Sequence, residues 1–410
     1  MKSGFSGAST ASLMLAGLFW LGGCSLVARA QAPASLPSAP TTNPAVYLDY
    51  RELGYSAATF GLTPAFQAAP FKKEPDLGGR SVTRGVFKFG NSSEQFVPFI
   101  LDAAQARLYL DLNRNQDLTD DPNGVFTSAE KPANAYYHSY RKIPLTFKTP
   151  AGMQKALVDI GIYSYGNPVT VQVECRYCWE GKVVFQGRDY QLALVDQLSG
   201  KLGSPEGGFL ALRPWADRDQ PLSVQSGSLE GFPFTRDLFF AGQSYRLDWS
   251  LLQQDGGLRY RVSVNPRAAE LGDLKLTGQH IHRLLLTRDG NPSLTVVLDS
   301  PNPLEQVPRG VYHYDLTLKA GAAEAHPVKA WGPAANPRVS VAGTNAAILA
   351  AGGPLTNTVT ANRNGKNLAL NYRLVGADGQ AYELQGQRKE PQWAVLRAGK
   401  QIDSGQFQFG

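Results

Sequence analysis

The residues best suited to chemistry lie in residues 108–121, where oxygen-bearing side chains recur at every second position. Six of them carry carboxylate or carboxamide groups: Asp111, Asn113, Asn115, Asp117, Asp120 and Asp121. Calcium takes about six to eight oxygen ligands in a flexible shell, and a loop with this spacing can wrap around such an ion. The segment therefore predicts a calcium site. The alternative is a turn in which the Asn and Asp side chains accept hydrogen bonds from their own backbone.

The loop resembles the calcium loops of the EF-hand and dockerin families over about a dozen residues. Four residues match positions one, three, five and eight of those loops: Asp111, Asn113, Asn115 and Leu118. Asp117 stands at position seven, where the family usually supplies a backbone carbonyl. The resemblance implies calcium as the cofactor. It ends at the flanks, because residues 106–110 alternate as a strand does and no helical period follows the loop.

Two positions of the loop depart from the family pattern. Gln116 replaces the glycine of the tight turn, and Pro122 replaces the acidic residue that closes the ligand shell. If the resemblance extends to ion binding, Asp120 or Asp121 has to close the site, or Glu130 from further along the chain.

Cys175 and Cys178 form a Cys-x-x-Cys pair. The surrounding residues 169–185 predict a strand, a turn and a second strand, which differs from the helix start of a redox pair. In an oxidising compartment this pattern predicts a structural disulfide across the turn, with free thiols or a redox or metal-binding pair as alternatives. A zinc site needs more ligands than two cysteines supply.

Histidine and tyrosine residues form two other clusters. His280 and His282 fall on one face of an expected strand, and His313 could join them from a neighbouring strand to bind zinc or copper. Partly exposed strand histidines are the alternative. Residues 136–141 gather aromatic and basic side chains, Tyr136, Tyr137, His138, Tyr140 and Arg141. They could line a sugar-binding face, or they could form an ordinary sheet edge or core.

The start of the chain predicts export. Residues 1–24 have the pattern of a signal peptide, with an apolar stretch at 11–21 that is too short to span a bilayer. Cys24 ends the sequence Leu-Gly-Gly-Cys, which resembles the bacterial lipobox and implies lipidation of Cys24. Cleavage after Ala30 is the alternative. Residues 25–44 are rich in Pro, Ala, Ser and Thr, which predicts a disordered tether.

These features predict the cellular location and the partners of the protein. A lipidated Cys24 would attach the protein to a membrane and place it in the outer membrane or periplasm, whereas cleavage at Ala30 would give a soluble secreted protein. The net charge of +6 is mild and no dense run of Lys and Arg occurs, so nucleic-acid binding is not predicted. A glycan or another envelope protein is the expected kind of partner.

Beyond residue 44 the pattern predicts strands nearly throughout. Short runs rich in Val, Leu, Tyr and Phe alternate with Gly, Asn, Asp and Pro turns, and no long amphipathic helix is indicated. Dipeptides typical of tight hairpins recur at Asp255-Gly256, Asp289-Gly290, Asn364-Gly365 and Asp378-Gly379. We therefore predict an all-β fold of two or three β-sandwich or hairpin-rich domains.

An internal repeat indicates duplicated hairpins. Residues 185–192 and 240–247 share the pattern F-x-G-x-x-Y-x-L, for which chance similarity is the alternative. The predicted domains are 45–230 with the ion loop, a smaller β domain at 231–330, and a β module at 331–410. The last resembles immunoglobulin-like domains in strand pattern only.

The sequence contains no G-x-S-x-G and no H-E-x-x-H motif, so familiar hydrolase sites are not indicated. These features together predict an exported, lipid-anchored, calcium-stabilised β-protein of the bacterial envelope, with a non-catalytic structural, adhesion or ligand-binding role. A carbohydrate-binding or carbohydrate-active protein that uses residues 136–141 is the alternative.

Overall fold

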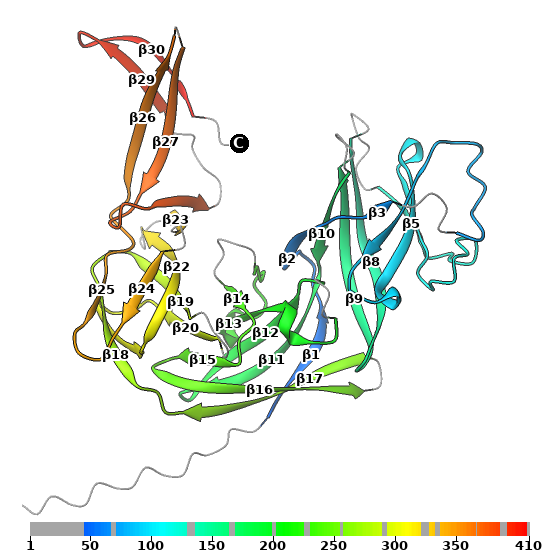
Figure 1. The fold of residues 1–410 in the computed structure, drawn as a ribbon, viewed down its shortest axis with the longest axis horizontal. Helices are drawn as coiled ribbons and strands as arrows, with labels where there is room; N and C mark the ends of the chain where they lie inside the picture. The colour runs from blue at the N-terminus through cyan, green and yellow to red at the C-terminus, as the bar shows by residue number, and fades with distance from the viewer. Residues whose placement is uncertain are drawn as a thin grey trace, which may run out of the picture. The chain divides into compact units, whose positions relative to one another are not determined.

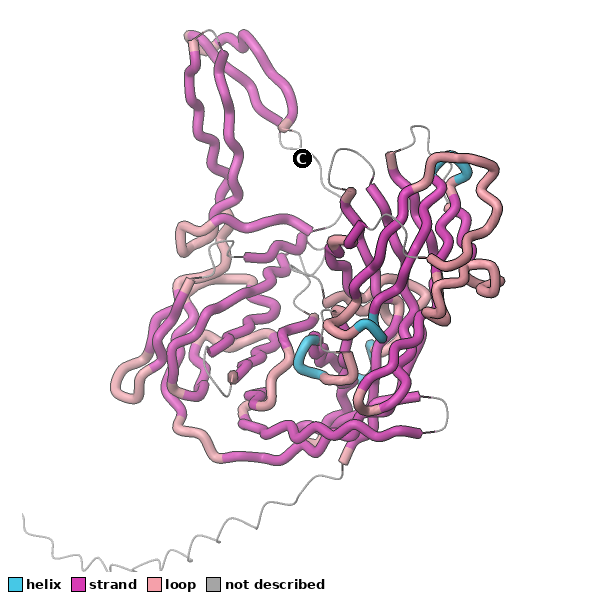
Figure 2. Tube along the Cα trace, turned by 45° about the vertical axis from the view of Figure 1, so that its right-hand side comes forward, coloured by secondary structure: helices cyan, strands magenta, loops and turns pink. Residues whose placement is uncertain are grey.

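The computed structural model describes residues 45–66, 71–128, 136–163, 169–198, 202–224, 230–254, 257–288, 293–320, 328–332, 337–365, 367–385 and 392–407. Residues 1–44 with Cys24, Glu130, and the Asp-Gly pairs at 255–256 and 289–290 lie outside these ranges. The described chain consists of strands with a few short 3-10 helices (Figure 2), which confirms the all-β prediction. It belongs to one compact unit, residues 42–410.

Within the described residues the strands form five sheets (Figure 1). The largest, in spatial order, contains β14 (Gly231–Pro233), β13 (Gly208–Pro214), β12 (Arg188–Asp196), β11 (Tyr177–Phe185), β1 (Val46–Glu52), β17 (Gly257–Arg267), β16 (Gln243–Gln254), β15 (Asp237–Phe240), β20 (Leu294–Asp299), β19 (Ile281–Arg288), β22 (Gly310–Ala320), β23 (Val328–Gly332), β28 (Ala381–Gln385), β27 (Asn367–Val375) and β26 (Thr356–Asn364), with β24 (Arg338–Val341) also paired to β22.

The other sheets are smaller. A four-stranded sheet contains β2 (Ala58–Leu62), β10 (Thr170–Cys175), β9 (Gly152–Tyr163) and β8 (Tyr137–Thr149), and a five-stranded sheet contains β3 (Ala65–Phe66), β4 (Thr83–Lys88), β5 (Phe96–Asp102), β6 (Arg107–Leu110) and β7 (Val125–Thr127). A three-stranded sheet contains β21 (Leu304–Pro308), β18 (Leu271–Leu276) and β25 (Ala347–Leu349), and the last sheet pairs β29 (Gln392–Arg397) with β30 (Lys400–Gln406).

Strand β1 pairs with strands from two of the predicted domains, 45–230 and 231–330. Its first half pairs with β17, where Val46 lies opposite Val262, and its second half pairs with β11, where Asp49 lies opposite Glu180. Strand pairing therefore continues across the expected boundary near 230, and the expected boundary near 330 falls inside β23. The division into domains stays a prediction.

Strands β19 and β20 serve two hydrophobic cores. Leu284 and Leu286 of β19 lie in one core, whereas Leu285 between them lies in the other. Val296 and Val297 of β20 divide between the two cores in the same way. A strand that is buried on both faces needs apolar residues at consecutive positions, which explains the continuous apolar runs in these segments.

The two F-x-G-x-x-Y-x-L segments occupy equivalent places in the hairpins β11–β12 and β15–β16. In each, Phe is the last residue of the first strand and the Gly turn residue has a positive φ, 73° at Gly187 and 79° at Gly242. Rings of the two hairpins pack against one another, with centroids 4.8 Å apart for Phe185 and Tyr245 and 4.9 Å apart for Tyr190 and Phe240. This equivalence is what a duplication requires, and duplication stays a hypothesis.

The disulfide expected between Cys175 and Cys178 is not present, because both are free and buried thiols. The two expected strands are present, but the expectation that a turn brings them together was wrong. Cys175 ends β10, which pairs with β2 and β9, whereas Cys178 lies in β11, which pairs with β1 and β12. The chain therefore passes from one sheet to another at Arg176, and the Cys175 sulfur lies 3.0 Å from the carbonyl oxygen of Asp196.

Candidate metal centre at the Asp111 loop

The loop that follows β6 is anchored at both ends. At its start, the Asp111 backbone N–H donates to the carbonyl oxygen of Pro98 at 3.0 Å. Further along, the Leu118 side chain is buried in a small core with Ile100 and Tyr109. The apolar residue at position eight therefore fixes the loop to the five-stranded sheet.

The loop wraps around the buried carboxylate of Asp111. One oxygen accepts a hydrogen bond from the Asn115 backbone N–H at 3.2 Å, and the other accepts one from the Gln116 backbone N–H at 2.9 Å. The backbone of Gln116 has φ 70°, the left-handed region that glycine prefers. Gln116 thus adopts the turn that the family forms with glycine, so this departure changes the residue but keeps the backbone shape.

Asn113 and Asn115 connect the first half of the loop to the second. Their amide nitrogens donate to the two oxygens of Asp120, at 2.9 Å from Asn113 and 2.6 Å from Asn115. Their amide oxygens accept from backbone N–H groups two residues ahead, at 3.0 Å and 2.6 Å. Each amide oxygen has a second lone pair, so these bonds leave it able to coordinate a cation.

Asp121 supplies the observation that distinguishes the loop from an ordinary turn. Its side chain is 8% exposed, and its Oδ2 is buried without a hydrogen-bond partner. Burial, followed by the charges of Asp111 and Asp120, raises the pKa of Asp121, against the smaller lowering effect of hydrogen bonds from the backbone of Asn113 and Leu112. A buried carboxylate oxygen without a partner is costly, and a bound cation relieves both the desolvation and the repulsion between these carboxylates.

The Asp117 side chain, which was expected to bind the ion, contacts Thr119 and Lys73 instead. Its Oδ1 accepts hydrogen bonds from the backbone and hydroxyl of Thr119, at 2.9 Å and 2.5 Å, and its Oδ2 lies 3.5 Å from the Lys73 ammonium. These partners hold the carboxylate in place as a structural group.

The oxygen atoms that could hold a cation therefore come from two kinds of side chain: the carboxylates of Asp111, Asp120 and Asp121, and the amides of Asn113 and Asn115. In the described part of the chain, no group of three or more His, Cys, Asp or Glu side chains is arranged to hold a metal. The carboxylates alone do not form a site, and the amide and backbone oxygens have to complete the shell. Such an all-oxygen set suits calcium better than zinc or copper.

The histidines expected to converge are separated along the sheet. Ile281 lies opposite Leu318, whereas His313 lies opposite Thr287. Five residues of β22 separate these positions, which corresponds to roughly 16 Å along a strand. The structure therefore does not bring His280 and His282 to His313, and the Arg338 Nε donates to His313 Nε2 at 3.1 Å.

The Tyr136–Arg141 cluster does not form one face. His138 and Tyr140 are completely buried, whereas Tyr136 is half exposed and Arg141 is exposed. Both ring nitrogens of His138 are buried without a hydrogen-bond partner, and burial lowers the pKa of this histidine. The cluster is divided between core and surface, so it does not present a continuous sugar-stacking platform.

Sequence reasoning missed a second polar group in the interior. Asp196 is buried at the end of β12, where it accepts hydrogen bonds from Gln154 Nε2 and the Leu198 backbone N–H, both at 2.7 Å. Burial raises the pKa of Asp196 to about 6. No local motif indicates this group, because Gln154 comes from β9 in another sheet.

Comparison with protein families, with curated proteins and with solved structures found no match. No helix in the described part of the chain has the length and apolar character needed to cross a bilayer.

Proposed function

We propose that this chain is an exported, lipid-anchored β-protein of the bacterial envelope, stabilised by calcium at the Asp111 loop and serving a non-catalytic structural or ligand-binding role. One observation carries the calcium assignment. The Asp121 Oδ2 is buried without a partner next to two other carboxylates, in a loop whose remaining groups satisfy one another. Export and the lipid anchor rest on the signal-peptide pattern and on Cys24.

Calcium in such a loop would act on stability. Without the ion, the charges of Asp111, Asp120 and Asp121 repel one another and oppose folding of the loop. With the ion bound, the loop is held against the five-stranded sheet through Asp111 and Leu118. Extracellular calcium modules bind with a Kd of about 10⁻⁴ to 10⁻³ M, which is sufficient for a site that is always exposed to external calcium.

The test is a thermal melt of the purified protein in 10 mM calcium and again in chelator. For a Kd near 10⁻⁴ M, this concentration stabilises the folded state by about 2.7 kcal/mol and raises the Tm by several degrees. Asp121→Asn should abolish the calcium-dependent rise, and it should leave the chelated protein at least as stable as the parent. Asp403→Asn, on the exposed hairpin β29–β30, is the matched control and should keep the full rise.

An equal Tm with calcium and with chelator would contradict the proposal and leave an Asn/Asp-rich turn. The same conclusion would follow if Asp121→Asn kept the full shift. Residues 136–141 do not support a carbohydrate-binding face, since His138 and Tyr140 are buried in the core.

A further inference from the structure

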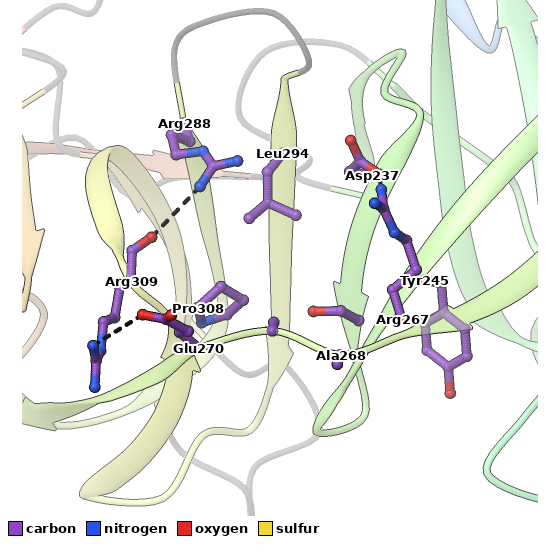
Figure 3. A pocket seen from close by; sticks show the side chains of 11 residues that line it. Asp237, Tyr245, Arg267, Ala268, Glu270, Arg288, Leu294, Pro308 and Arg309 are labelled. Carbon is purple, nitrogen blue, oxygen red and sulfur yellow. Dashed lines mark hydrogen bonds and ion pairs between the residues drawn. The ribbon is translucent and has the colours of Figure 1, made fainter. Parts of the chain in front are cut away.

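A cavity of about 390 Å³ lies where the ends of several strands of the large sheet meet, and it shares no residue with the Asp111 loop. Buried Leu294 and Pro308 give it an apolar floor, and Ala268 forms part of an exposed wall. Figure 3 shows Arg288 and Arg309 on one side of Leu294 and Arg267 on the other. A pocket of this volume is large enough for a small organic molecule.

Arg309 is fixed by two interactions. Its Nε donates to the Leu271 carbonyl oxygen at 3.1 Å, and its Nη1 pairs with Glu270 Oε2 at 3.0 Å (Figure 3). Gly343 makes room for the guanidinium, because a Cβ there would lie 2.2 Å from the Arg309 Cζ. Any side chain at Gly343 would therefore displace Arg309.

Arg288 lines the same cavity. Of the three arginines that line it, Arg288 is the one without a carboxylate partner among the described residues. Its Nη1 donates only to the Arg309 carbonyl oxygen, at 3.5 Å, and no carboxylate of the described residues pairs with it. Gly310 lies against its side chain, because a Cβ there would be 2.9 Å from the Arg288 Cδ. The remaining N–H groups of this guanidinium are available to a ligand in the pocket.

The charges around the cavity leave one positive charge unmatched. Asp237 pairs with Arg267 at 3.2 Å and with Arg246 at 3.0 Å, and Arg246 also lies 3.5 Å from Asp248. The residues that line the cavity supply three guanidinium groups, from Arg267, Arg288 and Arg309, against the two carboxylates of Asp237 and Glu270. A ligand with a single negative charge balances this set, whereas a dianion would leave one negative charge without a partner.

We propose that this pocket binds a small organic monocarboxylate. The carboxylate would be held by Arg288 at the mouth, since guanidinium groups present paired N–H donors that match the two oxygens of a carboxylate. The carbon body would lie on Leu294 and Pro308. The proposal is independent of the calcium site and of the lipid anchor.

The experiment uses calorimetry or ligand-observed NMR on the full protein with three probes: cyclohexanecarboxylate, the neutral cyclohexanecarboxamide and inorganic phosphate. The carboxylate should bind at least about tenfold more tightly than the amide, since one charged hydrogen-bonding contact is lost. Phosphate at equal concentration, at a pH alkaline enough that the dianion predominates, should not displace it. Each titration is done with calcium and with chelator, and both should give the same affinity.

Arg288→Gln should weaken carboxylate binding about tenfold or more, for the same loss of a charged contact. Ala268→Glu places a competing carboxylate in the exposed wall without touching the core, and it should weaken binding even if Arg288→Gln misfolds. Arg261→Gln, an exposed arginine of β17 outside the cavity, is the matched control and should bind as the parent does. Equal binding of carboxylate and amide, displacement by phosphate, unchanged binding in the pocket variants, or no binding by the parent would each overturn the proposal.

Discussion

The Asp196 carboxylate lies in the interior of a β-protein, with Gln154 and the Leu198 backbone as its hydrogen-bond donors. Two hydrogen bonds do not offset the loss of hydration, so burial raises its pKa from 3.8 to about 6. The protonated form is therefore the one that the folded state favours. The stability that this residue contributes is fully present below pH 3.8 and is lost as the pH rises through about 6.

We expect Asp196→Asn to remove this pH dependence. A pKa raised by roughly two units corresponds to about 3 kcal/mol in the free energy of unfolding in total, of which about 2 kcal/mol is lost between pH 4 and pH 7. The parent should lose this amount relative to the variant, because asparagine does not titrate. Denaturant unfolding of both proteins at the two pH values measures the difference. Parallel pH profiles would show that ionisation of Asp196 does not lower the free energy of unfolding.

At the scale of elements, the sequence predicted strands and tight hairpins well, since both depend on near neighbours. The Asn364-Gly365 and Asp378-Gly379 signals do lie in the connections β26–β27 and β27–β28. The passage from β10 to β11 was misread, because a local pattern cannot distinguish a hairpin from a crossing between two sheets. The arginine pocket was missed for a related reason: Asp237 and Arg309 come together only through strand pairing between distant segments.

The turn of the Asp111 loop gives a prediction at this scale. Gln116 has φ 70°, a conformation that costs a non-glycine residue about 1–2 kcal/mol, whereas glycine loses about 0.5–1 kcal/mol in chain entropy. Gln116→Gly should therefore stabilise the protein by up to about 1 kcal/mol with its calcium response unchanged. Thermal or denaturant unfolding measures this. Gln401→Gly, in the exposed strand β30, is the control and should destabilise or have no effect.

At the scale of the whole molecule, the expected lipid on Cys24 would decide where the protein resides. Acyl chains bind membranes through the burial of their CH₂ groups, so loss of the lipid should release the protein. Cys24→Ser should move it from the membrane fraction to the soluble fraction of expressing cells. Fractionation and intact mass measure this. A parent protein that begins at Gln31 and is soluble would establish cleavage after Ala30 instead.

The strands shared by the two cores have a further consequence, which concerns register. Where one face of a strand is polar, a slip by one residue is prevented because it would bury the polar side chains. In β19 and β20 a slip would exchange leucines and valines between the two interiors, so these residues alone do not select their partners. Polar pairs lie toward both ends of the ladder. Arg283 lies opposite Asp299, and its Nη2 donates to Asp299 Oδ2 at 3.0 Å, whereas Thr287 lies opposite the buried Thr295. A slip by one residue would separate both pairs and carry Thr295 toward the other core, so these polar residues favour the observed register.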